Sequence, residues 1–232
     1  YRANKISIYT EENDRYADYE VDVAFLGDSI TEGVGVSSAQ CRFADLLSSE
    51  YGILTVNHGI SGTRIARQTT PSLYPDHDRD FISRVDELDS DADVIMVFGG
   101  TNDYGHGDAP MGTMNDRTPY TFYGALHTLY TALITRFPEA LIVVMTPLHR
   151  LNENALVDEN GRRRAGTLRD YVNAIREVAE YYSLPVLDLY KESGMQPNVP
   201  VIQEMYIPDG LHPNDAGHEV LKNMIYSFLK SR

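Results

Sequence analysis

Two short segments far apart in the chain contain the side chains that nucleophilic catalysis requires. Ser29 lies where an apolar run gives way to a glycine-bordered turn, Gly-Asp-Ser-Ile-Thr-Glu-Gly, and Asp209 and His212 occur together in Asp-Gly-Leu-His-Pro. A serine hydroxyl is a poor nucleophile at neutral pH until a base takes its proton, and an imidazole held by a carboxylate is such a base. We therefore predict that Ser29, His212 and Asp209 act as nucleophile, base and orienting carboxylate in acyl transfer.

Acyl transfer also needs hydrogen-bond donors for the oxyanion that forms when a carbonyl is attacked. Two segments that lie between Ser29 and Asp209 in the sequence can supply these donors. They are Ile60-Ser61-Gly62-Thr63 and Gly100-Thr101-Asn102-Asp103. Gly62 has no side chain to obstruct close approach, and Asn102 offers a side-chain amide. The backbone N–H of Ser29 is the third predicted donor.

Three neighbouring residues are expected to serve the structure rather than the reaction. Gly59 is the nearest rival to Gly62 as the oxyanion glycine, although its place at a strand end favours a structural turn. Asp28 and Asp103 are expected to hold loops by accepting backbone hydrogen bonds.

Five short apolar runs are predicted to be buried strands. They are continuous rather than alternating, which is typical of a parallel sheet covered on both faces. The runs are residues 21–26, 53–57, 94–98, 141–145 and 186–189. Ser29, Gly62 and Asn102 each follow one of these runs closely, so they can meet at the carboxyl edge of the sheet.

Helical patterns lie between the apolar runs. Apolar residues recur every three or four positions within 168–182 and 220–229, which makes one apolar stripe in each. Thr118-Pro119 is predicted to begin a further helix that continues to Phe137, with the threonine as cap and the proline in the first turn. The alternation of strands and helices, in a chain long enough for one core, predicts a single domain over 1–232 with a three-layer α/β/α sandwich.

The four segments, in this order, resemble the four blocks of the SGNH hydrolases, also called the GDSL esterase/lipase family. The resemblance implies that Ser29 is the nucleophile, that Gly62 and Asn102 complete the oxyanion hole, and that Asp209 and His212 complete the triad. It also implies a flavodoxin-like five-stranded parallel sheet and an enzyme that needs no metal or organic cofactor.

The first block is similar to that of one subgroup in particular. Gly-Asp-Ser-Ile-Thr-Glu-Gly resembles the subgroup that contains carbohydrate O-acetyl esterases, acetylhydrolase-like proteins and lysophospholipase-like esterases. The Gly-x-Ser-x-Gly elbow of the α/β-hydrolases is absent, because Thr31 occupies the position of the second glycine. A lipase of that other fold is therefore disfavoured.

The residues that select the substrate are less marked. Arg64, Tyr104 and Tyr206 are candidate substrate contacts, although Arg64 can equally brace a carboxylate on a neighbouring loop. Three segments have no assigned structure and are expected to wall the site, namely 105–117, 149–166 and 191–208. Asp76-His77-Asp78 and His106-Gly107-Asp108 suggest a metal site, but a third ligand cluster at suitable spacing is missing, so we expect no metal.

Charge and hydropathy exclude other classes of protein. A formal net charge of −14 disfavours nucleic acid as a partner. No apolar stretch approaches the roughly 20 residues that span a bilayer. The single Cys41 fits a reducing compartment, and we expect a cytoplasmic location. Because the chain begins at Tyr1 rather than Met, a signal peptide or tag removed before numbering remains an open alternative.

We therefore expect a serine esterase that removes short acyl groups, acetyl foremost, from a small ester such as an acetylated carbohydrate, through an acyl-enzyme. A lysophospholipase or thioesterase is the alternative among enzymes. A flavodoxin-like binding protein without turnover is the alternative from another class. The oligomeric state is not predicted.

Overall fold

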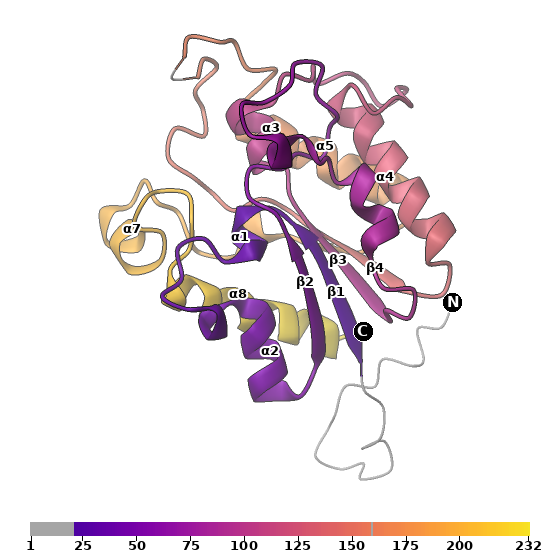
Figure 1. The fold of residues 1–232 in the computed structure, drawn as a ribbon. Coiled ribbons are helices and arrows are strands. Elements are labelled where there is room, and N and C mark those ends of the chain that lie inside the picture. Colours follow the sequence, from indigo (N-terminus) through magenta and orange to yellow (C-terminus); the bar gives the residue numbers. More distant parts are fainter. Residues whose placement is uncertain (1–20, 159) are drawn as a thin grey trace.

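The computed structural model describes residues 21–158 and 160–232, and its centre is a five-stranded parallel sheet (Figure 1). The strands lie in the order β2-β1-β3-β4-β5. They are β1 Asp22–Gly27, β2 Leu54–Gly59, β3 Val94–Phe98, β4 Leu141–Met145 and β5 Val186–Leu187. This confirms the predicted parallel sheet.

Helices cover both faces of the sheet. The α-helices are α1 Ser29–Glu32, α2 Phe43–Tyr51, α3 Thr101–His106, α4 Phe122–Arg136, α5 Leu168–Tyr181, α6 Leu189–Glu192, α7 Pro200–Tyr206 and α8 Asp215–Lys230. In the described part of the chain there are also three 3-10 helices, η1 Ala39–Cys41, η2 Pro75–Asp78 and η3 Ile82–Glu87. Figure 1 shows α2 and α8 on one side of the sheet and α4 and α5 on the other.

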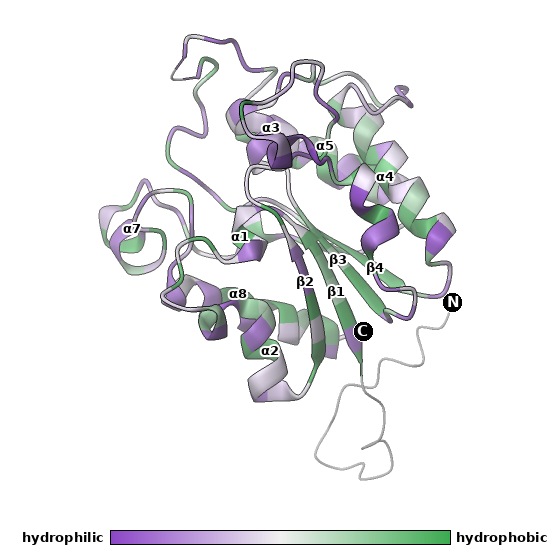
Figure 2. Cartoon of the chain, in the orientation of Figure 1, coloured by the Kyte–Doolittle hydropathy of each residue, from purple (hydrophilic) through white to green (hydrophobic). Residues whose placement is uncertain are grey.

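Alternate side chains of the strands enter two separate cores. From β1, Ala24 and Leu26 pack in the core that contains α4 and α5, whereas Val23 and Phe25 pack in the core that contains α2 and α8. The central strands are therefore apolar on both faces, and their ribbons are largely green, the colour of hydrophobic residues, in Figure 2. This arrangement is the predicted three-layer sandwich.

The strand order reverses direction at β1, which makes the carboxyl edge of the sheet between β1 and β3 a topological switch point. From β1 the chain moves outward to β2 and then crosses back to β3, so the connections after β1 and β3 diverge. Helix α1 begins two residues after β1, and α3 follows β3 after Gly99 and Gly100. Ser29 and Asn102 are thus carried to this edge of the sheet by adjacent strands.

Three strands differ from their predicted bounds. The inner strand β1 runs from Asp22 to Gly27, one residue later than predicted, and the other two, β2 and β5, lie at edges of the sheet. β2 continues to Gly59, beyond the predicted end at position 57. β5 ends at Leu187 rather than Leu189, because the side chain of Asp188 accepts a hydrogen bond from Lys191 N and caps α6. A polar residue that can cap a helix ends a strand that hydropathy alone would extend.

The predicted start of a helix at Thr118-Pro119 is wrong. Helix α4 begins at Phe122, and the side chain of Thr121 caps it. Thr118-Pro119 stays in the preceding loop because the carbonyl of Pro119 accepts a hydrogen bond from Arg67 N at 2.8 Å. The loop is therefore fixed by a contact from a distant segment.

The two predicted apolar stripes are confirmed. In α5 the stripe is buried, and Thr167 and Asp170 form a capping box at its start. Helix α8 begins at Asp215, before its stripe, with Asn214 as cap. Among the helices that the structure describes, none is both long and apolar enough to cross a membrane. The expectation of one domain over 1–232 stays a prediction, because 1–20 lie outside the described residues.

Burial of His218 makes stability depend on pH. Its side chain is fully buried, its Nδ1 accepts a hydrogen bond from Phe43 N at 3.1 Å, and its ring stacks on that of Phe43. Burial lowers the pKa of His218 to about 4. The unfolded chain binds this proton below its usual pKa near 6.5, whereas the folded protein does not, so stability is lost as the pH falls through this window.

We expect His218→Asn to weaken this dependence, because an asparagine oxygen can accept the Phe43 N–H but does not titrate. Between pH 6.5 and pH 4 the wild type should lose up to about 3 kcal/mol more free energy of unfolding than the variant. Urea unfolding at several pH values measures both slopes. Equal slopes for the two proteins would contradict this assignment.

Candidate functional site

The three residues predicted as a triad lie together. Ser29 is the first residue of α1, and His212 and Asp209 lie in the turn before α8. Ser29 Oγ is 3.0 Å from His212 Nε2, and His212 Nδ1 is 2.7 Å from Asp209 Oδ2. Because a carboxylate accepts, the proton of the neutral ring lies on Nδ1, which leaves Nε2 free to accept the Ser29 proton.

Hydrogen bonds hold Asp209 in place and in its ionised form. Its other oxygen, Oδ1, accepts from Leu211 N at 2.8 Å and from His212 N at 2.7 Å. Partial burial raises the pKa of the Asp209 carboxyl, but the bonds from His212 and Leu211 outweigh this effect and hold the pKa below its usual range. The carboxylate can therefore orient His212 and stabilise the imidazolium.

Asp28 fixes the turn that carries Ser29, the predicted nucleophile. Its side chain accepts from Ile30 N at 3.0 Å and caps α1, which places Ser29 in the first turn. The backbone N–H of Ser29, as the first of the helix, has no acceptor within it. Burial raises the pKa of Asp28 to about 7. The expected role of Asp28 as a holder of the loop is confirmed.

Asn102 and the Gly62 segment are fastened to each other. Asn102 Nδ2 donates to the carbonyl of Thr63 at 3.0 Å, which leaves the second amide proton available. The neighbouring Asp103 accepts from Ile65 N at 2.9 Å and Ala66 N at 2.8 Å, as expected of a carboxylate that holds a loop. Burial raises the pKa of Asp103 to about 6.

The other end of the Gly62 segment is attached to α1. Glu32 accepts hydrogen bonds from the backbone N–H and the hydroxyl of Ser61. Sequence reasoning missed this role of Glu32, although its place in the first block offered a hint. The side chain of Glu32 therefore fastens the segment that contains Gly62 to α1, the helix that begins at Ser29.

Only glycine fits at position 62. Its φ is +74°, in the left-handed region, and a Cβ there would lie 2.4 Å from the imidazole of His77. At Gly59 a Cβ would instead lie 2.1 Å from Glu32 N, so this glycine permits the close approach of β2 to α1. The close contact between Gly59 and α1 thus agrees with the structural role that was expected for this glycine.

The candidate substrate contacts are largely enclosed. Arg64 is 4% exposed and forms an ion pair with Asp78 at 2.7 Å. This contact matches the alternative in which Arg64 braces a carboxylate on a neighbouring loop. Tyr104 is 1% exposed, and its hydroxyl donates to the carbonyls of Asn152 and Ala155. Tyr104 therefore fastens the loop 149–166 to α3, which corrects its expected place in the pocket wall.

Tyr206 lies at the end of α7, half-buried against the core that contains α8.

The loop 149–166 also contacts the turn that carries Asp209 and His212. Leu151 N donates to the carbonyl of Gly210 at 2.8 Å. A Cβ on Gly210 would lie 2.4 Å from the Leu151 side chain, so the leucine packs directly on the turn. Nothing in the sequence marked Leu151 for this role.

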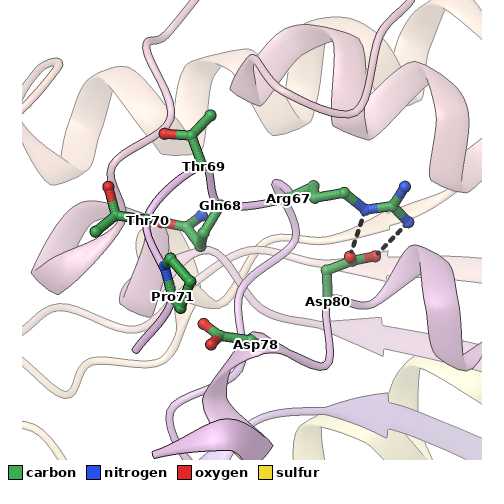
Figure 3. A pocket seen from close by; sticks show the side chains of 7 residues that line it. All are labelled: Arg67, Gln68, Thr69, Thr70, Pro71, Asp78 and Asp80. Atoms are coloured by element: carbon green, nitrogen blue, oxygen red, sulfur yellow. Dashed lines mark hydrogen bonds and ion pairs between the residues drawn. The ribbon is translucent and has the colours of Figure 1, made fainter. Parts of the chain in front are cut away.

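A small pocket of about 170 Å³ has Asp78 in its wall (Figure 3). It is lined by Arg67, Gln68, Thr69, Thr70, Pro71, Asp78 and Asp80. Figure 3 shows Arg67 and Asp80 pointing toward each other, and they form an ion pair at 2.9 Å. No triad residue lines this pocket. Within residues 21–158 and 160–232, no group of three or more His, Cys, Asp or Glu side chains is arranged to hold a metal ion.

Residues 25–220 match the family described as GDSL-like Lipase/Acylhydrolase, and this range contains every segment of the site. The chain belongs to this family. Its members are hydrolases in which a serine nucleophile and a catalytic triad are typical. The predicted resemblance and the predicted class of enzyme are confirmed. No curated protein matches the chain.

Solved structures agree with this GDSL-type fold. A protein from Lactobacillus plantarum is 35% identical, with a TM-score of 0.77 over 92% of this chain and 98% of that one. A lipase/acylhydrolase from Enterococcus faecalis is 22% identical, with a TM-score of 0.64 over 91% and 96% of the two chains. An acetyl xylan esterase is 20% identical, with a TM-score of 0.61 over 90% and 99%. The last two establish likeness of fold alone.

We expect Asp209→Asn to reduce kcat on p-nitrophenyl acetate about a thousand-fold or more, at an unchanged fold. The amide oxygen can keep the backbone bonds, but its N–H₂ group faces His212 Nδ1 and favours the tautomer that presents a proton to Ser29. Asp215→Asn, which alters a carboxylate bonded to Ser37, is the matched control and should keep its activity. A rate for Asp209→Asn within tenfold of the wild type would be inconsistent with this role.

Proposed function

We propose that this protein is a serine esterase that hydrolyses short-chain O-esters, acetyl esters foremost, on a carbohydrate. The observation that carries the proposal is the alignment of Ser29 Oγ, the His212 ring and Asp209 at 3.0 and 2.7 Å. The bonds from Asn102 to Thr63 and from Ser61 to Glu32, which fasten the Gly62 segment to α3 and α1, support the proposed oxyanion donors. Membership of the GDSL-type family supports the reaction class.

In the first half-reaction, Ser29 Oγ attacks the ester carbonyl while His212 Nε2 takes the serine proton. The oxyanion of the tetrahedral intermediate accepts hydrogen bonds from the backbone N–H groups of Ser29 and Gly62 and from the amide of Asn102. His212 then gives its proton to the departing alcohol, and the acyl group remains on Ser29.

In the second half-reaction, water replaces the alcohol. His212 takes a proton from the water as it attacks the acyl-enzyme, and returns that proton to Ser29 Oγ as the carboxylic acid leaves. Asp209 stays ionised throughout and stabilises the imidazolium. No step requires a metal or an organic cofactor.

The surroundings of Gly62 support a small acyl group and a polar alcohol. The imidazole of His77 covers Gly62, which limits the space next to this donor. Arg64 and Asp78 lie behind it as an ion pair. Tyr74 is 65% exposed, and its ring centroid is 5.0 Å from that of His77, so it offers an aromatic face of the kind on which sugars stack.

The rival substrate class is a longer acyl chain, as in a lysophospholipid or an acyl thioester. Its support is a set of exposed apolar side chains on α7 and the loop before η2. They are Val201, Met205 and Leu73. Exposed apolar side chains of this kind can contact an alkyl chain, whereas the polar groups around Gly62 cannot stabilise one.

We expect the initial rate of hydrolysis to fall with chain length from p-nitrophenyl acetate through butyrate and octanoate to palmitate. The His77 ring restricts the space beside Gly62. An acyl chain longer than acetyl therefore does not fit in this space and must extend out of it. Ser29→Ala should abolish the activity on all four esters, and an acetylated oligosaccharide should release acetate in a Ser29-dependent manner. A Ser29-dependent optimum at octanoate or palmitate would overturn the substrate class, and full activity of Ser29→Ala would overturn the mechanism.

A further inference from the structure

A chain of hydrogen bonds leads from Asp78 to the amide of Asn102. Asp78 Oδ1 accepts from Arg64 Nη2 at 2.7 Å. Arg64 Nη1 is 3.2 Å from His106 Nδ1, and His106 Nε2 is 3.2 Å from Asn102 Oδ1. His106 lies one helical turn after Asn102 on α3, so its ring stands beside the amide.

The chemistry of the groups fixes the direction of every bond in this chain. A guanidinium only donates, so His106 Nδ1 must accept from Arg64. The single proton of the neutral His106 ring is therefore on Nε2, from which it is donated to Asn102 Oδ1. The other end of the Asn102 amide donates to the carbonyl of Thr63 at 3.0 Å.

The two partners together permit only one orientation of the amide. If the Asn102 amide turned over, its oxygen would face the carbonyl oxygen of Thr63, and its N–H₂ group would face the N–H of His106. Both contacts would then be repulsive in a site where Asn102 is 5% exposed. The observed orientation keeps one amide N–H free for an oxyanion.

We propose that His106 is a positioning residue for ester hydrolysis, which acts through Asn102 by holding the amide with its N–H₂ group toward the oxyanion. This inference rests on the proposed function. It assigns a role to the residue that begins His106-Gly107-Asp108, which sequence reasoning weighed only as a metal site.

The charge state of His106 agrees with this role. Burial, followed by the charges of Arg64 and His77, lowers the pKa of His106 to about 4. The ring therefore stays neutral under ordinary conditions and keeps Nδ1 as an acceptor. Arg64 in turn is held by Asp78 and by the carbonyl of His77 at 3.0 Å, so the donor to His106 is itself fixed.

The test compares variants that remove, keep or displace the bond to Asn102. His106→Ala removes it. In His106→Gln the side-chain amide can reach the position of Nε2 and can still donate to Asn102. In His106→Asn the side chain is shorter, so its amide reaches only the position of Nδ1, which faces Arg64. The two amide variants are therefore matched in chemistry and differ in the bond that they can make.

We expect His106→Ala to lower kcat on p-nitrophenyl acetate about tenfold to a hundredfold with little change in KM, because the oxyanion donor acts in the transition state. His106→Gln should recover most of this loss and His106→Asn should not. Asn102→Ala should lose more than His106→Ala, and the double variant should lose no more than Asn102→Ala alone, because His106 acts only through that amide.

Three results would overturn the inference. They are wild-type kcat in His106→Ala, losses of His106→Ala and Asn102→Ala that multiply in the double variant, and equal recovery by glutamine and asparagine. If His106→Ala does not fold, the difference between His106→Gln and His106→Asn decides alone. Ser29→Ala is measured in parallel, since its full activity would refute the proposed function itself rather than the role of His106.

Discussion

The buried guanidinium of Arg84 joins the parts of the fold on which the site depends. Arg84 is 1% exposed and donates to the carbonyl of Gly27 at 3.0 Å, to that of His58 at 2.8 Å and to Thr63 Oγ1 at 3.0 Å. Gly27 lies at the end of β1, His58 lies near the end of β2, and Thr63 follows Gly62 in the segment 60–63 that is proposed to bind the oxyanion. Burial lowers the pKa of Arg84 to about 10, which still leaves it charged at neutral pH.

A buried charge is costly unless hydrogen bonds offset its desolvation, and three acceptors do so here. The same bonds hold the segment of Gly62 against the end of the sheet, while Glu32 and Asp103 attach it to α1 and α3. Donors held in this way need little reorganisation when an oxyanion forms, which is the main source of electrostatic catalysis. The cost of burying Arg84 thus supports a preorganised site.

The triad turn is held differently. The side chain of Asp209 is 55% exposed, and the turn is kept in place by its own backbone bonds and by Leu151, which packs on Gly210. Leu151 belongs to the loop 149–166, which Tyr104 anchors to α3. The position of His212 therefore depends on a loop, whereas the positions of the proposed oxyanion donors depend on the core of the fold.

Sequence reasoning succeeded where a local pattern determines the outcome. β3 and β4 have their predicted bounds because they are buried on both faces, and hydropathy reports burial directly. The bounds of β5 were wrong because an edge strand can be ended by one capping residue, Asp188. The start of α4 was wrong because a contact between Arg67 and Pro119 decides it.

For the site too, sequence reasoning found the residues that a local motif marks and missed those whose partners are remote. The reactive segments identified Ser29, Asp209 and His212, which the structure brings together. Ser29, Gly62 and Asn102 each follow a strand closely, whereas Asp209 and His212 lie in the turn between α7 and α8. The supporting side chains could not be found, because their partners are remote: Arg84 is 57 residues from Gly27, and Glu32 is 29 from Ser61. Tyr104 was misplaced because nothing in its neighbourhood shows that a loop 48 residues later covers it.

The central claim is that Ser29 carries the acyl group between the two half-reactions. Rapid acid quenching of the enzyme during turnover of p-nitrophenyl acetate, followed by peptide mass spectrometry, tests it directly. We predict one acetyl group on the peptide that contains Ser29, assigned to that residue by fragmentation and lost again when the substrate is exhausted. Continued turnover with Ser29 unmodified, and a transient acetyl group on a different residue, would contradict the account.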